Sequence, residues 1–112
     1  MSASRAFVTI PTALLLFSTW IYAQPDLLRQ GIALMNASRP LEAEEVLKSV
    51  SESHADYRSA RVLLGFLFLR RTALGEAEQA FRCVLDADPD SAPARLGLGM
   101  TYVNKGMARQ AA

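Results

Sequence analysis

Cysteine, histidine and tryptophan are nearly absent from this 112-residue sequence, which contains one copy of each. The single cysteine, Cys83, has no partner for a disulfide bond within the chain. Cys83 and the single histidine, His54, cannot supply a Cys/His metal cluster or a Cys–His dyad without a partner. These absences remove most catalytic options, and we predict that the chain is not an enzyme and carries no metal or cofactor.

An excess of one charge sign is also absent. Twelve Lys and Arg residues face eleven Asp and Glu residues, which gives a formal net charge of +1. Charges of both signs alternate along the chain without a basic stripe or an acidic tail, as is usual for the solvated faces of helices. Nothing in this balance favours a nucleic acid as the partner.

The N-terminal segment 1–23 has the pattern of a targeting segment. Arg5 precedes an uncharged run from Ala6 to Ala23, and Ala23 supplies the small residue of a signal-peptide cleavage position. The run is about 18 residues long, near the lower limit for spanning a bilayer, so an uncleaved anchor at 6–23 is the alternative to a cleaved signal peptide. An ordinary buried helix is a third interpretation. Both leading interpretations place residues 24–112 outside the cytoplasm, either in a periplasm or secreted.

What the sequence does contain is an internal repeat with a period of about 34 residues. Four rows of equivalent residues carry the repeat without insertions. The rows are Gly31, Gly65 and Gly99; Ala43, Ala77 and Ala111; Leu34, Phe68 and Tyr102; and Leu47 with Phe81. They predict repeat units at 24–57, 58–91 and 92–112, the third of which is incomplete.

Each unit is predicted to form two helices joined by a short turn. In the second unit, apolar residues at helical spacing predict a first helix over 58–71, and Thr72 is placed to cap the second. The second helix carries its apolar face on residues 74–85 and ends before Pro89, which cannot continue a helix. The glycine of the first helix and the alanine of the second, such as Gly65 and Ala77, let the two axes approach closely. Leucine at either position should cost about 1–3 kcal/mol by overpacking.

The third unit is predicted to turn at Lys105–Gly106, a basic last turn followed by a glycine stop, after which Met107 begins the second helix. The sequence ends at Ala112, inside this predicted second helix. A polar capping helix, which solenoids need, is not present. We therefore expect the chain to be a piece of a longer repeat array.

This pattern resembles the tetratricopeptide repeat family over residues 24–112. The resemblance is carried by Leu64, Gly65, Phe68, Ala77, Phe81 and Pro89 in the second unit, and by Leu98, Gly99, Tyr102, Gly106 and Ala111 in the third. It implies an all-α solenoid of about two and a half helical hairpins, with the first helices lining the concave groove of a right-handed superhelix. It also implies an interaction module that binds another protein, without naming the ligand.

The positions that would face this groove are mostly apolar. They are Leu28, Ile32 and Met35; Val62, Phe66 and Leu69; and Leu96, Met100 and Val103, with the polar Asn36, Arg70 and Asn104 at the rim. The nine apolar residues together with Arg70 and Asn104 are the predicted binding set, named the groove residues below. Family members that grip a terminal carboxylate place Lys, Arg and Asn in the groove itself. An apolar groove containing methionine instead favours a hydrophobic peptide or the apolar face of a helix.

The leading functional hypothesis is an exported module that binds an apolar peptide or helix. The nine apolar groove residues form a patch that a ligand, a second copy or further chain must cover. Two alternatives follow: an assembly piece that stacks with its own copies or with another repeat protein, and an adaptor segment of a longer protein. A membrane contact is predicted only through an uncleaved N-terminal segment.

Two polar motifs that could suggest catalysis are interpreted as structural. Glu42, Glu44 and Glu45 lie beside Lys48 on a predicted outer helix face, where i, i+4 pairing and solvation explain them. His54 follows two serines in the linker between the first two units. Catalysis is not expected there, because close neighbours in a linker provide no enclosing pocket.

A third motif and the lone cysteine are interpreted in the same way. Asp86, Asp88 and Asp90 alternate as in a calcium loop but lack its glycine and its distal glutamate. A turn or helix-cap role for Asp90 or Ser91 is predicted instead. Cys83 is predicted to be a small apolar residue of the core, with oxidation or pairing between chains as the alternative outside the cytoplasm.

Overall fold

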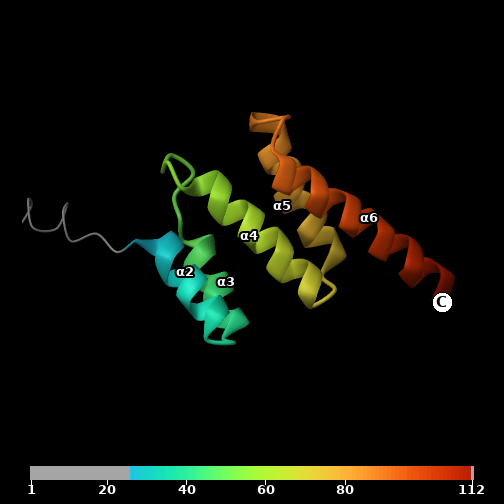
Figure 1. The fold of residues 1–112 in the computed structure, drawn as a ribbon, viewed down its shortest axis with the longest axis horizontal. Coiled ribbons are helices and arrows are strands. Elements are labelled where there is room, and N and C mark those ends of the chain that lie inside the picture. Colours follow the sequence, from blue (N-terminus) through green and yellow to red (C-terminus); the bar gives the residue numbers. More distant parts are fainter. Residues whose placement is uncertain (1–25, 112) are drawn as a thin grey trace, which may run out of the picture.

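The computed structural model describes residues 26–111, which form five α-helices and no strand (Figure 1). The helices are α2 (Leu27–Asn36), α3 (Pro40–Lys48), α4 (Tyr57–Arg70), α5 (Leu74–Ala87) and α6 (Ala92–Ala111). The all-helical class predicted from the sequence is confirmed for this part of the chain. The predicted targeting segment at 1–23 lies outside the described residues. Within 26–111, no helix combines the length and the apolar character needed to cross a membrane.

The helices lie in two layers, with α2, α4 and α6 nearer the viewer in Figure 1 and α3 and α5 behind them. Each helix contacts the next one along the chain, and α4 also contacts α6. The core is built mainly from α3, α4 and α5. Its largest fully buried apolar side chains are Leu47, Leu64, Leu67, Phe81 and Val84. Helix α4, which contacts α3, α5 and α6, is therefore covered on more sides than α6, the last described helix.

The turn between α2 and α3 is closed by two backbone hydrogen bonds. The Ser38 N–H donates to the Met35 carbonyl at 3.1 Å, and the Arg39 N–H donates to the Leu34 carbonyl at 2.9 Å. These are the two bonds of a Schellman motif, in which the residue after the helix takes a left-handed conformation. Ser38 accordingly has a φ of 61°.

The turn between α4 and α5 has the same geometry one repeat period later. The Thr72 N–H donates to the Leu69 carbonyl at 3.0 Å, the Ala73 N–H donates to the Phe68 carbonyl at 2.8 Å, and Thr72 has a φ of 58°. The Thr72 hydroxyl donates to the Arg71 carbonyl at 2.6 Å, and the N-cap of α5 is Ala73. The prediction that Thr72 caps α5 is wrong, because this residue is used to end α4.

Glycine in place of Thr72 should stabilise the protein. The left-handed conformation costs a residue with a Cβ about 1–2 kcal/mol, and most for a β-branched one. Glycine also increases the conformational entropy of the unfolded chain, which offsets part of this gain. We therefore expect Thr72→Gly to raise the free energy of unfolding by about 1 kcal/mol. Urea unfolding measures this change. Thr72→Ala keeps the Cβ and serves as the control, and an equal gain in that variant would contradict the explanation.

Two glycines receive bulky side chains from the helix that follows. A Cβ at Gly31 would lie 2.4 Å from Leu47 Cδ2, and a Cβ at Gly65 would lie 2.5 Å from Phe81 Cε1. Ala77, on the helix opposite Gly65, is fully buried. The close approach predicted at Gly65 is confirmed, since any larger residue there would overlap the Phe81 ring, whereas for Ala77 only its burial is shown.

Phe81 also fills the space beside a glycine that the repeat pattern did not single out. A Cβ at Gly97 of α6 would lie 2.2 Å from Cε1 of the Phe81 ring. The same ring is fully buried and packs edge-to-face against Phe66, with the ring centroids 5.1 Å apart. By contrast, nothing lies within 4 Å of a Cβ built at Gly99. Because Gly99 is equivalent to Gly31 and Gly65 in the repeat, a second helix was expected to pack closely against it. No such contact is present, because no described helix follows α6.

Helix α6 runs through Lys105 and Gly106 without interruption. The helix end predicted at Lys105–Gly106 and the second helix predicted from Met107 are therefore wrong. No described glycine has a positive φ, so Gly106 does not form the left-handed turn seen after α2 and α4. Continuing the helix through the glycine costs about 1 kcal/mol.

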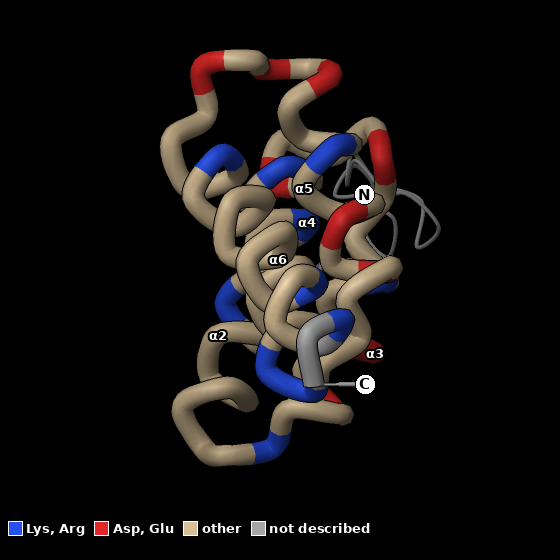
Figure 2. The backbone as a smooth tube through the Cα atoms, turned by 90° about the vertical axis from the view of Figure 1, so that its right-hand side faces the viewer, with Lys and Arg blue, Asp and Glu red and all other residues tan. Residues whose placement is uncertain are grey.

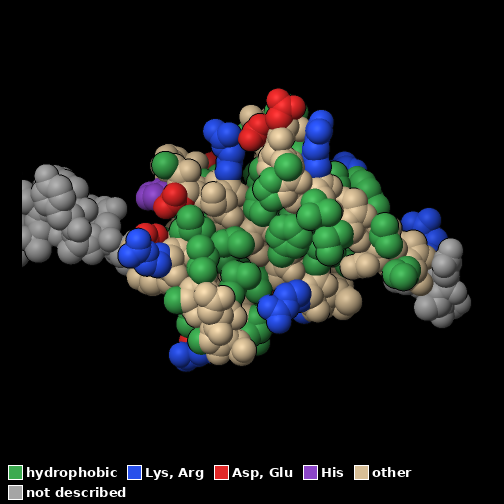
Figure 3. Space-filling view, viewed as in Figure 1, with side chains coloured by type: hydrophobic (Ala, Val, Ile, Leu, Met, Phe, Trp, Pro, Cys, Tyr) green, Lys and Arg blue, Asp and Glu red, His purple; other side chains and the backbone are tan. Residues whose placement is uncertain are grey.

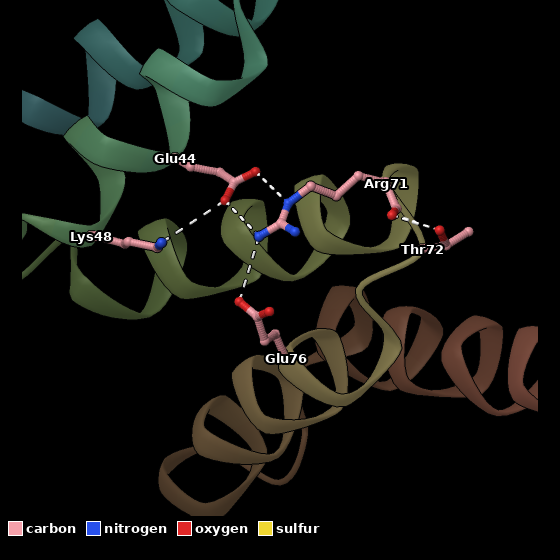
Figure 4. Close-up of polar contacts among 5 residues, drawn as sticks. All are labelled: Glu44, Lys48, Arg71, Thr72 and Glu76. Carbon is pink, nitrogen blue, oxygen red and sulfur yellow. Dashed lines mark hydrogen bonds and ion pairs between the residues drawn. The ribbon is translucent and has the colours of Figure 1, made fainter.

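A buried carboxylate joins α3 to the end of α4 (Figure 4). Glu44 is only 4% exposed and accepts from Arg71 Nε at 2.9 Å and from Arg71 Nη2 at 3.1 Å, while Lys48 Nζ lies 3.9 Å away. The hydrogen bond with Glu44 raises the pKa of Arg71 above its ordinary value. The predicted i, i+4 pair of Glu44 and Lys48 is confirmed. The predicted solvation of Glu44 is wrong, because Arg71 at the end of α4 covers its carboxylate.

A similar cluster of one carboxylate and two basic side chains joins α5 to α6. Glu78 accepts from Lys105 Nζ, and Arg82 Nη2 lies 2.9 Å from the other Glu78 oxygen. Glu78, Arg82 and Lys105 lie one repeat period after Glu44, Lys48 and Arg71, respectively. Each cluster ties a second helix to the first helix of the next unit.

These contacts make stability depend on pH. The hydrogen bond from Lys105, with the charges of Lys105 and Arg82, holds the pKa of Glu78 below its usual range despite partial desolvation. A carboxylate whose pKa is lowered by folding stabilises the protein above its unfolded pKa, and this contribution is lost as the pH falls through the folded pKa. The stability difference between the wild type and Glu78→Gln should therefore be constant near neutrality and shrink below about pH 4. Urea unfolding of both proteins at several pH values tests this, and a difference that is unchanged in acid would contradict it.

Candidate peptide-binding surface

The groove residues lie on α2, α4 and α6, the three helices of the nearer layer in Figure 1. Apolar side chains gather over these helices in the space-filling view (Figure 3). Their exposure differs from helix to helix, because α4 is covered by neighbours on both sides and α6 on one side only. Leu69 of α4 is 7% exposed, whereas the equivalent Val103 of α6 is 61% exposed. The α6 end is thus the part of the predicted surface that a partner can reach most easily.

One hollow of about 580 Å³ lies between α2, α4 and the turn that precedes α6. It brings together three groove residues, Leu28 and Ile32 of α2 and Val62 of α4. The remaining lining residues are Ala55, Arg58, Ser59, Leu63, Val84, Asp88, Ser91 and Pro93. The hollow therefore has an apolar floor with charges of both signs at its edge, contributed by Arg58 and Asp88.

A second hollow, of about 670 Å³, follows the length of α6. It is lined by Arg95, Leu96, Gly99, Met100, Val103, Asn104 and Met107. Leu96, Met100, Val103 and Met107 are spaced by four, three and four residues, which places them on one face of the helix. All four are exposed, from 43% for Met100 to 63% for Met107. They form a continuous apolar stripe, named the α6 stripe, with Arg95 and Asn104 beside it.

The remaining groove residues do not join these hollows. Leu69 lies in the core, where a ligand cannot reach it. Phe66 is half-buried because its ring packs against Phe81, and Met35 is half-buried against the core. Arg70 is exposed and lies instead beside a smaller hollow of about 320 Å³ that includes Leu41.

The polar motifs of the sequence do not assemble a reactive centre in residues 26–111. Within that range, no three His, Cys, Asp or Glu side chains come close enough to hold a metal ion. His54 is exposed, and its Nδ1 accepts from the Asp56 N–H at 3.0 Å. The Ser91 hydroxyl accepts from the Ala94 N–H at 3.4 Å, which confirms the predicted cap at the start of α6. Cys83 is half-buried, so its predicted place in the core is only partly confirmed.

The chain was compared with family models, with curated proteins and with solved structures. None of the three comparisons gave a match.

Three exposed large apolar residues were not in the predicted set, namely Leu41, Tyr102 and Met107. Met107 extends the α6 stripe by one turn, and it was assigned to a separate helix because Gly106 was expected to end α6. Met107 lies four residues after Val103, and this helical spacing was the sequence feature that could have placed it on the same face. Leu41 is 68% exposed on α3. It lies on a different helix from the groove residues, and no repeat row contains it.

Proposed function

We propose that residues 24–112 form a tetratricopeptide-type array that binds an apolar peptide or helix on its α2–α4–α6 face. The array is supported by three kinds of contact that recur after one repeat period. These are the left-handed turns at Ser38 and Thr72, the glycine contacts of Leu47 and Phe81, and the ion clusters centred on Glu44 and Glu78. Independent backbone, packing and charge features thus share the period read from the sequence.

The α6 stripe is the observation that carries the binding function. Soluble proteins rarely leave a contiguous row of large apolar side chains in water, and such rows commonly mark an interaction site. The two methionines of the stripe are flexible and polarisable, which suits a surface that adapts to a partner's shape. A spacing of four and three residues matches the apolar seam between two packed helices. The stripe therefore favours a helical ligand over an extended one.

Export is the second part of the proposal. The uncharged run from Ala6 to Ala23, preceded by Arg5, is the pattern of a segment that enters a membrane during secretion. The interaction module would then act outside the cytoplasm, either free after cleavage or held at the membrane by residues 6–23. The partner would be another exported protein or peptide.

A glutamate at Met100 should weaken ligand binding while leaving the protein folded. A displayed library of random peptides of about 12 residues, selected against the full chain, supplies the ligand. The side chain of Met100 is 43% exposed, so a charge there costs little in the free protein. In the complex, the same charge would be buried against apolar groups. We expect the Kd of the selected peptides, measured by fluorescence anisotropy, to rise by at least about tenfold.

Leu41→Glu is the matched control, since Leu41 is even more exposed but lies on α3. It should leave the Kd unchanged. Equal weakening by both variants, or selection of peptides without an apolar face, would contradict the proposal. Self-assembly, the second candidate, predicts instead that the wild type is a dimer or larger oligomer in light scattering and that Met100→Glu makes it a monomer.

A further inference from the structure

Helix α6 carries a glycine notch that no described side chain fills. Gly31 of α2 receives Leu47 of α3, and Gly65 of α4 receives Phe81 of α5. Gly99 holds the same place on α6, but a Cβ there would meet nothing within 4 Å. The first two glycines thus show that a leucine or a phenylalanine side chain fits such a notch, whereas the notch at Gly99 is open.

The surroundings of the open notch are uncovered as well. Tyr102 lies one turn after Gly99 and is 44% exposed, whereas the equivalent Phe68 of α4 is 4% exposed. Arg95 lies one turn before Gly99 and is exposed. These three α6 residues, spaced by four and three, share one side of the helix and are named the notch face. It adjoins the α6 stripe, and α6 is the foremost helix when the molecule is viewed from this end (Figure 2).

The charges of the helices indicate what the notch face would accept. α4 and α6 each contain three basic residues and no acidic one, whereas α3 and α5 each contain three acidic residues and one basic residue. The basic helix α4 packs most extensively against the two acidic helices α3 and α5, and less extensively against the basic helix α6. Pairing α6 with the α6 of a second copy would bring like charges together, which disfavours that occupant.

We propose that the notch face docks an acidic helix of another protein, which packs on α6 as α5 packs on α4. The docked helix carries a small residue followed four residues later by leucine or phenylalanine, as in Ala43 with Leu47 and Ala77 with Phe81. The bulky side chain enters the notch at Gly99, and the acidic residues of the helix face Arg95 and Arg109 of α6, since Lys105 is already paired with Glu78 of α5. This surface does not require the groove residues to bind anything.

The peptide LGEAEQAFRSVLDA, which is the α5 sequence 74–87 with serine in place of Cys83, is the probe. Labelled at its N-terminus and titrated with the full chain, it should bind with a measurable change in fluorescence anisotropy. Replacing its phenylalanine with alanine should weaken binding by at least about tenfold, because the notch is then left unfilled. Replacing both glutamates with lysine should weaken it similarly and make the residual binding less sensitive to salt.

In the protein, Gly99→Leu should abolish this binding without loss of thermal stability, since the notch is open and leucine favours a helix. Gly75→Leu is the matched control, because Gly75 is also an exposed helical glycine with nothing within 4 Å. It should leave the affinity unchanged. Met100→Glu, which tests the groove residues, should affect the selected apolar peptides and not prevent the α5 peptide from binding.

Four results would overturn the inference. They are peptide binding that persists in Gly99→Leu, equal affinity of the phenylalanine and alanine peptides, no binding at about 1 mM peptide, and a wild-type dimer that Gly99→Leu dissociates. The last result would assign the notch face to a second copy of this chain. Arg95 and Gly99 also line the hollow along the α6 stripe, so Gly99→Leu alone does not separate the two surfaces. The comparison of the phenylalanine and alanine peptides does, because it tests the notch and not the binding of apolar peptides to the α6 stripe.

Discussion

Replacing Phe81 with alanine is expected to lower the free energy of unfolding by about 3–5 kcal/mol. The ring is fully buried and occupies the space beside two glycines, Gly65 of α4 and Gly97 of α6, while its edge meets Phe66. Its loss removes contacts on two neighbouring helices, α4 and α6, at once. The helices cannot close the cavity easily, because their glycines already allow the closest approach of the backbones.

Thermal unfolding followed by circular dichroism measures this effect. For a domain of this size, about 1 kcal/mol corresponds to 4–8 °C in Tm, so Phe81→Ala should lower Tm by well over about 10 °C. Leu41→Ala removes an equally apolar side chain that is 68% exposed, and should change stability by less than about 0.5 kcal/mol. Similar losses in the two variants would show that Phe81 does not hold the helices together as described.

Gly97→Ala and Gly99→Ala should change stability in opposite directions, although the two glycines are neighbours on α6. A methyl group at Gly97 would lie 2.2 Å from the Phe81 ring, and the repacking should cost about 1–3 kcal/mol. A methyl group at Gly99 meets nothing within 4 Å. That variant should gain about 0.5–1 kcal/mol from the better helix propensity of alanine.

The Gly97 effect should disappear when Phe81 is removed. In a Phe81→Ala background, the added methyl group enters the space that the ring has left, so Gly97→Ala should become neutral or stabilising. The coupling energy from this double-mutant cycle, about 0.5–3 kcal/mol for residues in contact, isolates the contact between the ring and the glycine. Additive losses in urea unfolding would contradict the packing described for α5 and α6.

Much of the fold could be predicted from the repeat pattern because its signals are local. The helix predicted over 58–71 is found at Tyr57–Arg70, and the next helix begins at Leu74, as its apolar face indicates. Long-range features were missed for physical reasons. The ion pair of Glu44 and Arg71 joins residues that are 27 positions apart. The repeat pattern relates only residues that are one period apart, so it does not predict this pair. The Gly97 contact has no equivalent glycine in the earlier units, so no row revealed it.

The site was harder to predict, because phase along a helix does not determine exposure. Leu69 and Val103 occupy equivalent positions, yet only Val103 is accessible, since α4 has neighbours on both sides and α6 does not. Met107 was excluded by the helix end expected at Gly106. A glycine ends a helix by adopting a left-handed conformation, and no described glycine has a positive φ.

Methyl NMR of the full chain, titrated with a peptide selected from the library, tests the proposed binding surface most directly. Methyl groups of Leu, Val and Met report contact residue by residue. We expect the largest shifts at Leu96, Met100 and Val103, smaller ones at Ile32 and Val62 if the methyl groups of isoleucine are labelled too, and none at Leu41. Shifts centred on Leu41 and α3, with the α6 stripe unchanged, would contradict the proposal that this chain binds apolar helices along α6.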